Sequence, residues 1–148
     1  MLNNGRLQTA EHILAKVLED KYNIKVGVCK FEPEQGSLEV YSDVDLREVS
    51  VVNLETQTNQ VIAQNLEVSK TTIPRAEAEQ MENLRNLRAV PKSIQQLRIV
   101  GIGNFDQRPC KDPHVANTKD IGKIQIREIK RVGRNRYRFL FSLRLQKI

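Results

Sequence analysis

The chain contains very little cysteine and histidine, with two residues of each among 148. Two cysteines, Cys29 and Cys110, allow one disulfide at most, so the disulfide-rich class of small secreted domains is excluded. We expect two free thiols, or one thiol that serves as a ligand. The two histidines, His12 and His114, lie almost a full chain length apart. We expect the fold to bring them together in one site.

Long apolar runs are also missing. No stretch approaches the roughly 20 apolar residues that a membrane-spanning helix requires, and no apolar secretory core follows residues 1–6. We therefore expect a cytoplasmic protein that does not engage a membrane. Hydrophobic residues make up 39% and charged residues 28% of the chain, as in ordinary soluble globular proteins. With no internal repeat and no linker, residues 1–148 are predicted to form a single domain.

Positive charge is concentrated near the C-terminus. The net charge is +6, yet residues 119–148 alone hold ten Lys or Arg against two acidic residues, a local charge of +8. Such a basic surface indicates a polyanionic partner such as nucleic acid, although it is also compatible with a solvated strand face. The candidate contact residues are Arg127, Lys130, Arg131, Arg134 and Arg136.

The hydrophobic pattern predicts an α+β fold, with a mainly antiparallel sheet and two long helices packed on it. Apolar residues recur at helical spacing over residues 6–22, and a second helix is expected over 46–64. Strict alternation over 137–145 is the clearest strand signal. Further elements are predicted as strands near 24–29, 38–41, 67–72, 97–103 and from 124, a helix over about 72–81, and a loop over 82–95.

Two short segments carry the residues that are able to do chemistry. Cys110 and His114 are four apart in a stretch whose prolines keep it out of a regular helix, so a loop between two strands must place them. Gln8 and His12 are also four apart, on the first predicted helix, and therefore stand on the same face. Both border the apolar stripe and should face a cleft or the core.

A thiolate and two imidazoles form a ligand set that suits zinc. Catalytic zinc sites commonly use three protein ligands and leave one position for water, and His12, Cys110 and His114 would form such a set. Gln8 could orient the water or offer a weak neutral oxygen ligand. On spacing alone, however, a Cys-x-x-x-His pattern arises often by chance, and a histidine on a helix face is commonly a packed residue.

Both segments resemble a known family. The run from Cys110 through His114 to Ile124 resembles the Cys-x-x-x-His segment of the editing domain of alanyl- and threonyl-tRNA synthetases, which also occurs in free-standing editing proteins of the AlaX type. Gln8-Thr-Ala-Glu-His12 resembles the His-x-x-x-His helix of the same family. Their order and large separation also match. The resemblance covers essentially the whole chain, so we expect a free-standing editing domain.

The resemblance implies an aminoacyl-tRNA hydrolase, a carboxylic ester hydrolase that acts on a wrong amino acid attached to tRNA. An activated water would attack the ester carbonyl, with His12, Cys110, His114 and Gln8 as the catalytic group. The first three would hold Zn²⁺, as AlaX-type members do. The expected partner is the tRNA acceptor end, held by the basic C-terminal third through phosphate contacts, and no DNA is expected.

The chain departs from the family at two points. Gln8 replaces the first histidine of the helix motif, and an amide can neither act as a base near pH 7 nor bind zinc as an imidazole does. The residues between Cys110 and His114 are Lys-Asp-Pro rather than the Gly-Gly-Thr of the alanyl version, and a proline before the histidine is found in the threonyl version. Serine on alanine tRNA is the leading substrate, and serine on threonine tRNA is the alternative.

The family also suggests where the amino acid binds. Gly27 and Cys29 lie on the strand after the first helix, where the family lines its pocket, and Asp106 precedes the cysteine motif and could bond the substrate amine. A buried, inert thiol is the plain alternative for Cys29. Two other functions stay open: a non-catalytic tRNA-binding module with a degenerate site, for which Gln8 is the argument, and a metallohydrolase of small free esters. The sequence does not determine the oligomeric state.

Overall fold

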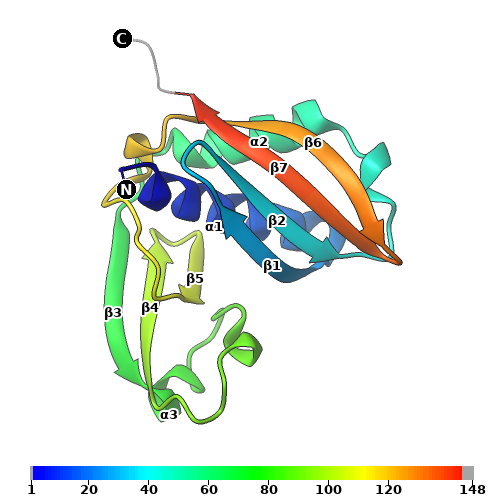
Figure 1. Cartoon of the computed structure of the whole chain (residues 1–148). Coiled ribbons are helices and arrows are strands. Elements are labelled where there is room, and N and C mark those ends of the chain that lie inside the picture. Colours follow the sequence, from blue (N-terminus) through cyan, green and yellow to red (C-terminus); the bar gives the residue numbers. More distant parts are fainter. Residues whose placement is uncertain (1, 145–148) are drawn as a thin grey trace.

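A computed structural model describes residues 2–144 of the chain (Figure 1). The helices are α1 (Leu2–Tyr22), α2 (Val51–Ile62) and the short α3 (Arg75–Ala78), with 3-10 turns at Leu46–Glu48, Leu87–Ala89 and Thr118–Asp120. The strands are β1 (Lys25–Phe31), β2 (Gln35–Tyr41), β3 (Val68–Pro74), β4 (Gln96–Ile102), β5 (Asp106–Pro109), β6 (Lys123–Gly133) and β7 (Arg136–Arg144).

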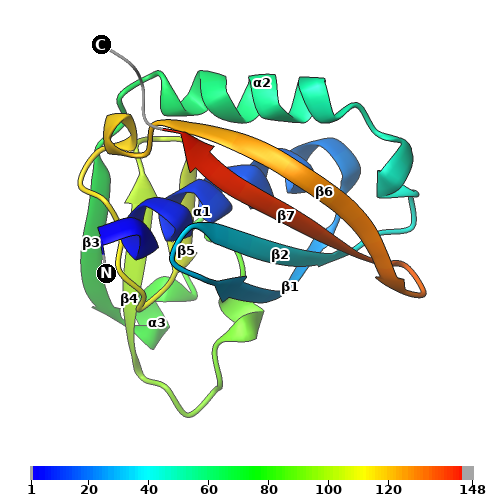
Figure 2. The same cartoon turned by 45° about the horizontal axis from the view of Figure 1, so that its top comes forward.

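The larger sheet has the strand order β1-β2-β7-β6, and each neighbouring pair is antiparallel. The two long helices lie side by side on one face of this sheet, with α1 across β1 and β2 and α2 along β6 (Figure 2). The α+β class and the two helices packed on an antiparallel sheet are therefore confirmed. Two pairs of consecutive strands form hairpins, since β1 pairs with β2 and β6 pairs with β7.

The main core lies between this sheet and the two helices. Strict alternation on β7 places Phe139 and Phe141 on the buried face, where neither ring is exposed to solvent. Leu38 of β2 pairs with Phe139 across the sheet and shares that face. Gly36 pairs with Phe141, and a Cβ at this position would come within 2.6 Å of the ring. The glycine therefore lets the phenylalanine ring lie flat over β2.

A second, three-stranded sheet has the order β3-β4-β5, again antiparallel throughout. It stands at the N-terminal end of α1, with β5 closest to that helix (Figures 1 and 2). The sequence pattern did not separate the two sheets and did not predict β5. Four residues that include two charges and a proline give no periodic signal, and backbone pairing with β4 defines the strand instead.

Two helix boundaries differ from the expected ones. Asp45 caps a 3-10 turn rather than the long helix, and Ser50 then caps α2 by accepting a hydrogen bond from the Asn53 amide at 3.2 Å. The helix expected over 72–81 is reduced to the four residues of α3, because β3 continues as far as Pro74. The helix α2 therefore begins at Val51 rather than near residue 46.

Residues 75–95 form a small lobe that packs on β4 of the second sheet and reaches α1 through Arg85. Leu97 and Ile99 of β4 are buried there under Ala78, with apolar side chains of the lobe around them. Over residues 2–144 no helix is both long and apolar enough to cross a membrane. Cys29 and Cys110 are both free thiols, as expected.

Candidate functional site

His12, Cys110 and His114 meet where α1 passes the loop that follows β5. One nitrogen from each ring and the Cys110 sulfur all lie within 4.8 Å of one another. The Cys110 Sγ atom is 3.4 Å from His114 Nε2, and the two imidazole rings contact edge to face with centroids 4.4 Å apart. The predicted trio is therefore one cluster in space. His12 is completely buried and His114 is 8% exposed, so little water reaches the two rings.

Thr9, which the sequence did not single out, fixes the orientation of His114. Its hydroxyl donates to the Gly5 carbonyl at 2.9 Å and lies 2.9 Å from His114 Nδ1. Because the hydroxyl hydrogen is used on Gly5, the oxygen must accept from the imidazole, so the ring proton sits on Nδ1. The Val115 amide donates to the same oxygen at 3.3 Å. Nε2 is then left with its lone pair directed at Cys110.

Burial keeps both rings neutral. Loss of solvation, and after it the nearby cations Arg98, Lys70 and Arg108, together lower the pKa of His114 to about 3. The pKa of His12 is lowered well below its usual value, first by burial and then by Arg108 and the neighbouring imidazole. Burial also raises the pKa of the Cys110 thiol. Without a metal the cluster thus consists of two neutral imidazoles and a protonated thiol.

The cluster has the donor chemistry of a zinc site. Neither ring nitrogen of His12 has a hydrogen-bond partner among the described residues, although the ring is fully buried. An unsatisfied buried polar group costs about 1–3 kcal/mol, and a metal bound to one of the nitrogens would remove that cost. Two neutral imidazoles and a thiol also match the ligand types and the spread of a tetrahedral zinc centre. The residues present therefore fit Zn²⁺.

A buried ion pair supports the cluster from behind. Glu11 of α1 and Arg108 of β5 join through two hydrogen bonds of 2.8 and 3.1 Å, and the Glu11 side chain is 1% exposed. This bidentate pair ties the helix that carries His12 to the strand that leads to Cys110. Cys29 lies against the same pair, and burial together with the Glu11 charge raises the pKa of its thiol.

A second buried pair fixes the same helix and strand. Arg85 forms two hydrogen bonds with Asp106 of β5, at 2.5 and 2.9 Å, and an ion pair with Glu19 of α1 at 2.6 Å. Its guanidinium also donates to the His12 carbonyl at 3.3 Å. The carboxylate of Asp106, a predicted pocket residue, is thus engaged by Arg85. No sequence pattern connects Arg85 with these partners.

A cleft of about 490 Å³ opens beside Cys110. Gly27 of β1 forms one wall, and Arg98 of β4 lies on another, together with residues 89–91 of the small lobe. Cys29 and Asp106 do not line this cleft. Gln8 lies one helical turn before His12, is 6% exposed and makes no hydrogen bond to the cluster among the described residues. Of the predicted pocket residues, the structure places Gly27 in the cleft beside Cys110.

Comparison with known proteins places these residues in a family context. The sequence model described as the Threonyl and Alanyl tRNA synthetase second additional domain matches residues 97–139, from β4 into β7, which includes Cys110 and His114. The alanyl-tRNA editing protein AlaX-M of Saccharolobus solfataricus is 29% identical over 140 residues, which cover 94% of this chain and 58% of that protein. The chain is therefore similar over residues 97–139 to the second additional domain of these synthetases, and over most of its length to an alanyl-tRNA editing protein.

Other relatives extend the editing-domain relationship. The alanyl-tRNA editing protein AlaX-L of Pyrococcus horikoshii is 27% identical over 94% of this chain, and 33% of its own length is covered. The alanine–tRNA ligase of Saccharolobus islandicus is 27% identical over 86% of the chain, which corresponds to 14% of the ligase. The chain therefore spans about half of one editing protein and a third of the other.

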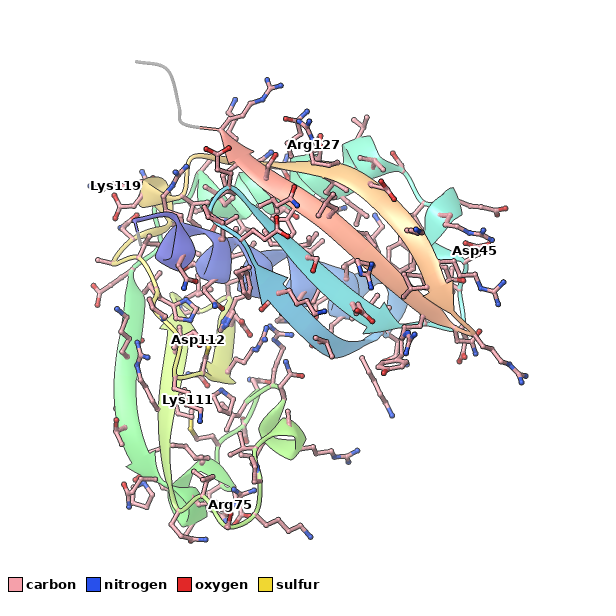
Figure 3. All side chains as sticks on the ribbon, in the orientation of Figure 1. Asp45, Arg75, Lys111, Asp112, Lys119 and Arg127 are labelled. Atoms are coloured by element: carbon pink, nitrogen blue, oxygen red, sulfur yellow. The ribbon has the colours of Figure 1, made fainter. Side chains whose placement is uncertain are left out.

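The basic residues that were expected to hold the tRNA lie on another part of the molecule. All five are on β6, β7 or the turn between them, at the edge of the larger sheet. Arg127 lies on the side of the molecule away from Lys111 and Asp112, which flank the cleft (Figure 3). Arg136 forms an ion pair with Glu39 at 3.6 Å. Their role in tRNA binding stays a prediction.

Proposed function

We propose that this chain hydrolyses the ester bond of mischarged aminoacyl-tRNA, with serine on alanine tRNA as the leading substrate. The observation that carries the proposal is the cluster of His12, Cys110 and His114 beside a cleft. The two similar editing proteins are named for alanyl-tRNA, and the similar ligase is an alanine–tRNA ligase, which favours alanine tRNA over threonine tRNA. The chemistry is the transfer of an acyl group from a ribose oxygen to water.

The site residues contribute to this reaction in distinct ways. His114 presents a neutral Nε2 lone pair toward the centre, because Thr9 holds the ring proton on Nδ1. That lone pair can serve as a metal ligand or accept a proton from the attacking water. His12, Cys110 and His114 would hold Zn²⁺, which when bound supplies a Lewis acid and lowers the pKa of a coordinated water. Gln8 is proposed to orient the water, since its amide can both donate and accept.

The bond changes follow from these roles. The oxygen of water bonds to the ester carbonyl carbon, and the bond from that carbon to the ribose oxygen breaks. The water proton passes to the ribose oxygen, so that free amino acid and tRNA are released. The buried position of both rings keeps bulk water from the centre. Gly27, which lines the cleft together with Cys110, is proposed to border the aminoacyl group, whereas Cys29 and Asp106 lie at the two buried ion pairs and do not line the cleft.

Ester loss from charged tRNA tests the proposal. We expect the protein to accelerate the loss of serine from alanine tRNA that is mischarged with serine. It should act more slowly on alanine tRNA that is correctly charged with alanine. Cys110→Ala and His12→Ala should abolish the acceleration, because each removes a group from the centre. Threonine tRNA mischarged with serine tests the alternative substrate. Ester loss no faster than in buffer on both seryl-tRNAs would overturn the proposal.

A second candidate function, a non-catalytic tRNA-binding module, follows from Gln8. The neutral amide removes one imidazole from the family motif, and a degenerate site could still bind RNA. This candidate predicts salt-sensitive tRNA binding, no bound zinc and no ester loss. Metal analysis of the purified protein, combined with the deacylation assay, separates the two candidates, because the hydrolase requires turnover and the binding module excludes it.

A further inference from the structure

Two basic side chains of the second sheet hold the loop that carries the cluster. The Lys70 ammonium donates to the His114 carbonyl at 3.2 Å. The Arg98 guanidinium donates to the Asp112 carbonyl at 3.1 Å. Both cations therefore stand directly beside the loop, although neither belongs to the basic strand that the sequence indicated.

The sheet register places the two cations on the same face. Lys70 of β3 pairs with Val100 of β4, and Arg98 lies two residues before Val100. Residues on neighbouring strands that are offset by two share a face and are about 7–8 Å apart. Arg108 pairs with Val100 from the other side, so this face also carries the arginine that contacts Glu11. It is the face that looks toward α1 and the site.

The charges of Lys70 and Arg98 are not compensated by carboxylates. Within residues 2–144 neither forms an ion pair, whereas the neighbouring Arg108 and Arg85 are each paired with buried acids. The bond to a neutral carbonyl uses one of three donors on Lys70 and one of five on Arg98. Lys70 is exposed beside the loop that carries His114, and Arg98 lines the cleft, so the remaining donors of both side chains are available to a ligand.

We propose that Lys70 and Arg98 bind the phosphodiester backbone of the RNA strand that delivers the aminoacyl ester to the cluster. The proposal rests on the proposed function, since it concerns the substrate of the same site. The guanidinium of Arg98 matches two phosphate oxygens, while Lys70 acts as a point charge one strand away. Lys111, exposed on the same loop, adds positive charge to the entrance. The RNA end then approaches over β3 and β4.

This path differs from one over the basic strand. Arg127 bonds to Gln125 on β6, and Figure 3 shows it away from Lys111 and Asp112. An RNA strand that ends at the cluster must pass the border of the cleft, where its last phosphates come closest to Lys70 and Arg98. The basic strand can add attraction at longer range, but it does not border the cleft.

Binding of an uncharged RNA hairpin that ends in CCA tests the proposal without any ester. We expect Lys70→Gln and Arg98→Gln each to weaken binding about fivefold to tenfold. Each should also reduce the slope of log affinity against log salt by about 0.7, the value for one single-strand phosphate contact. Lys21→Gln and Arg47→Gln, at exposed basic residues that do not line the cleft, are the controls and should leave the affinity within about twofold. Equal losses in all four variants, or none in Lys70→Gln and Arg98→Gln, would overturn the proposal.

A double-mutant cycle, in which a protein variant is combined with a modified RNA, separates phosphate binding from support of the loop. The same hairpin with one neutral methylphosphonate linkage before the terminal adenosine should bind wild type about fivefold more weakly. When the modified RNA is combined with Arg98→Gln, the loss of affinity should be much smaller than the product of the two separate losses, because both changes remove the same contact. Additive losses for Lys70 and Arg98 alike would show that the two residues only brace the loop. Because the RNA carries no ester, the result stands whether or not the protein proves to be a hydrolase.

Discussion

Replacement of Thr9 by valine tests the orientation of His114 most directly. Valine has nearly the same shape as threonine but lacks the hydroxyl, so the packing of α1 is preserved. The change removes the acceptor for the His114 ring proton and for the Val115 amide, both now bonded to Thr9 Oγ1. The imidazole is then able to rotate and to exchange its proton between the two nitrogens, so that Nε2 no longer presents a fixed lone pair.

The structure sets the expected magnitude. The imidazole loses an acceptor in a buried setting and the amide loses one in a partly buried setting, at about 1–2 kcal/mol apiece, so the free energy of unfolding should fall by about 2–4 kcal/mol. For a chain of this length the Tm should fall by roughly 5–15 °C. Loss of the partner that orients a metal-binding histidine costs about 10–100-fold in metal affinity or activity. We expect both effects in Thr9→Val.

The assay combines zinc affinity, deacylation rate and chemical unfolding in three variants. Thr9→Ser keeps the hydroxyl and should retain most of the activity. Thr58→Val is the matched control, because Thr58 is also buried in a helix and donates to the carbonyl four residues earlier, Leu54, at 2.8 Å. It lies on α2, far along the chain from the cluster residues. We expect it to lower stability without a change in zinc affinity.

The reasoning fails if Thr9→Val binds zinc and deacylates tRNA as wild type does. It also fails if Thr58→Val impairs both properties to the same extent, since the loss would then reflect general destabilisation. If Thr9 had only a packing role, its replacement by valine would change the Tm but not the zinc affinity. Zinc affinity is therefore the readout that decides between an orienting and a purely structural role.

Three further outcomes are expected. His12→Ala should reduce bound zinc and turnover to background. Gln8→His should raise zinc affinity, measured by competition with a chelator, because it adds an imidazole one turn away from His12. Unchanged zinc affinity in both variants would contradict the proposed metal site. In the metal-free protein, the free energy of unfolding should decrease as pH falls from about 6.5 to 3, by up to about 1.4 kcal/mol per pH unit. The reason is that His114 takes up a proton in the unfolded chain over this range, but not in the folded chain, where its pKa is about 3. Urea unfolding at pH 3 and 7 measures this, and equal midpoints would refute it. Asp106→Asn should cost about 1.5–3 kcal/mol, because the buried Arg85 loses the charge of one of its two carboxylate partners and keeps Glu19. A lower urea midpoint at constant slope would show this cost, and a loss of less than about 1 kcal/mol would show that the Asp106 pair is dispensable.

Much of the fold was predictable because its signals are local. The alternation over β7 and the helical spacing of α1 each reflect one buried face, which a short window of sequence contains. The strand β5 has no such window, because Asp106 and Arg108 point toward buried acid–base partners on other elements rather than toward an apolar core. The division into two sheets depends on pairing between distant strands and has no local signature.

The site was only partly predictable, for a related reason. His12, Cys110 and His114 were found because they are rare residue types in a recognisable order. Thr9 and Arg85 are common types, and their importance comes from partners that the fold brings to them, so the sequence did not mark them. Charge counting likewise identified a basic segment but not its location relative to the cleft, since net charge along a chain carries no information about which surface it will occupy.

The hydrogen bond between Thr9 and His114 closes a loop of 105 residues, and this has a consequence for folding. A flexible loop of that length costs about 4 kcal/mol in chain entropy to close, so helix α1 alone cannot hold the later segment in place. During synthesis the helix emerges many seconds before the cysteine motif at about 5–20 residues per second. In a partly synthesised chain, His12 therefore has no partner ligands for a metal. Metal binding should coincide with the last stage of folding. Zinc uptake would then report when a newly made molecule has become native.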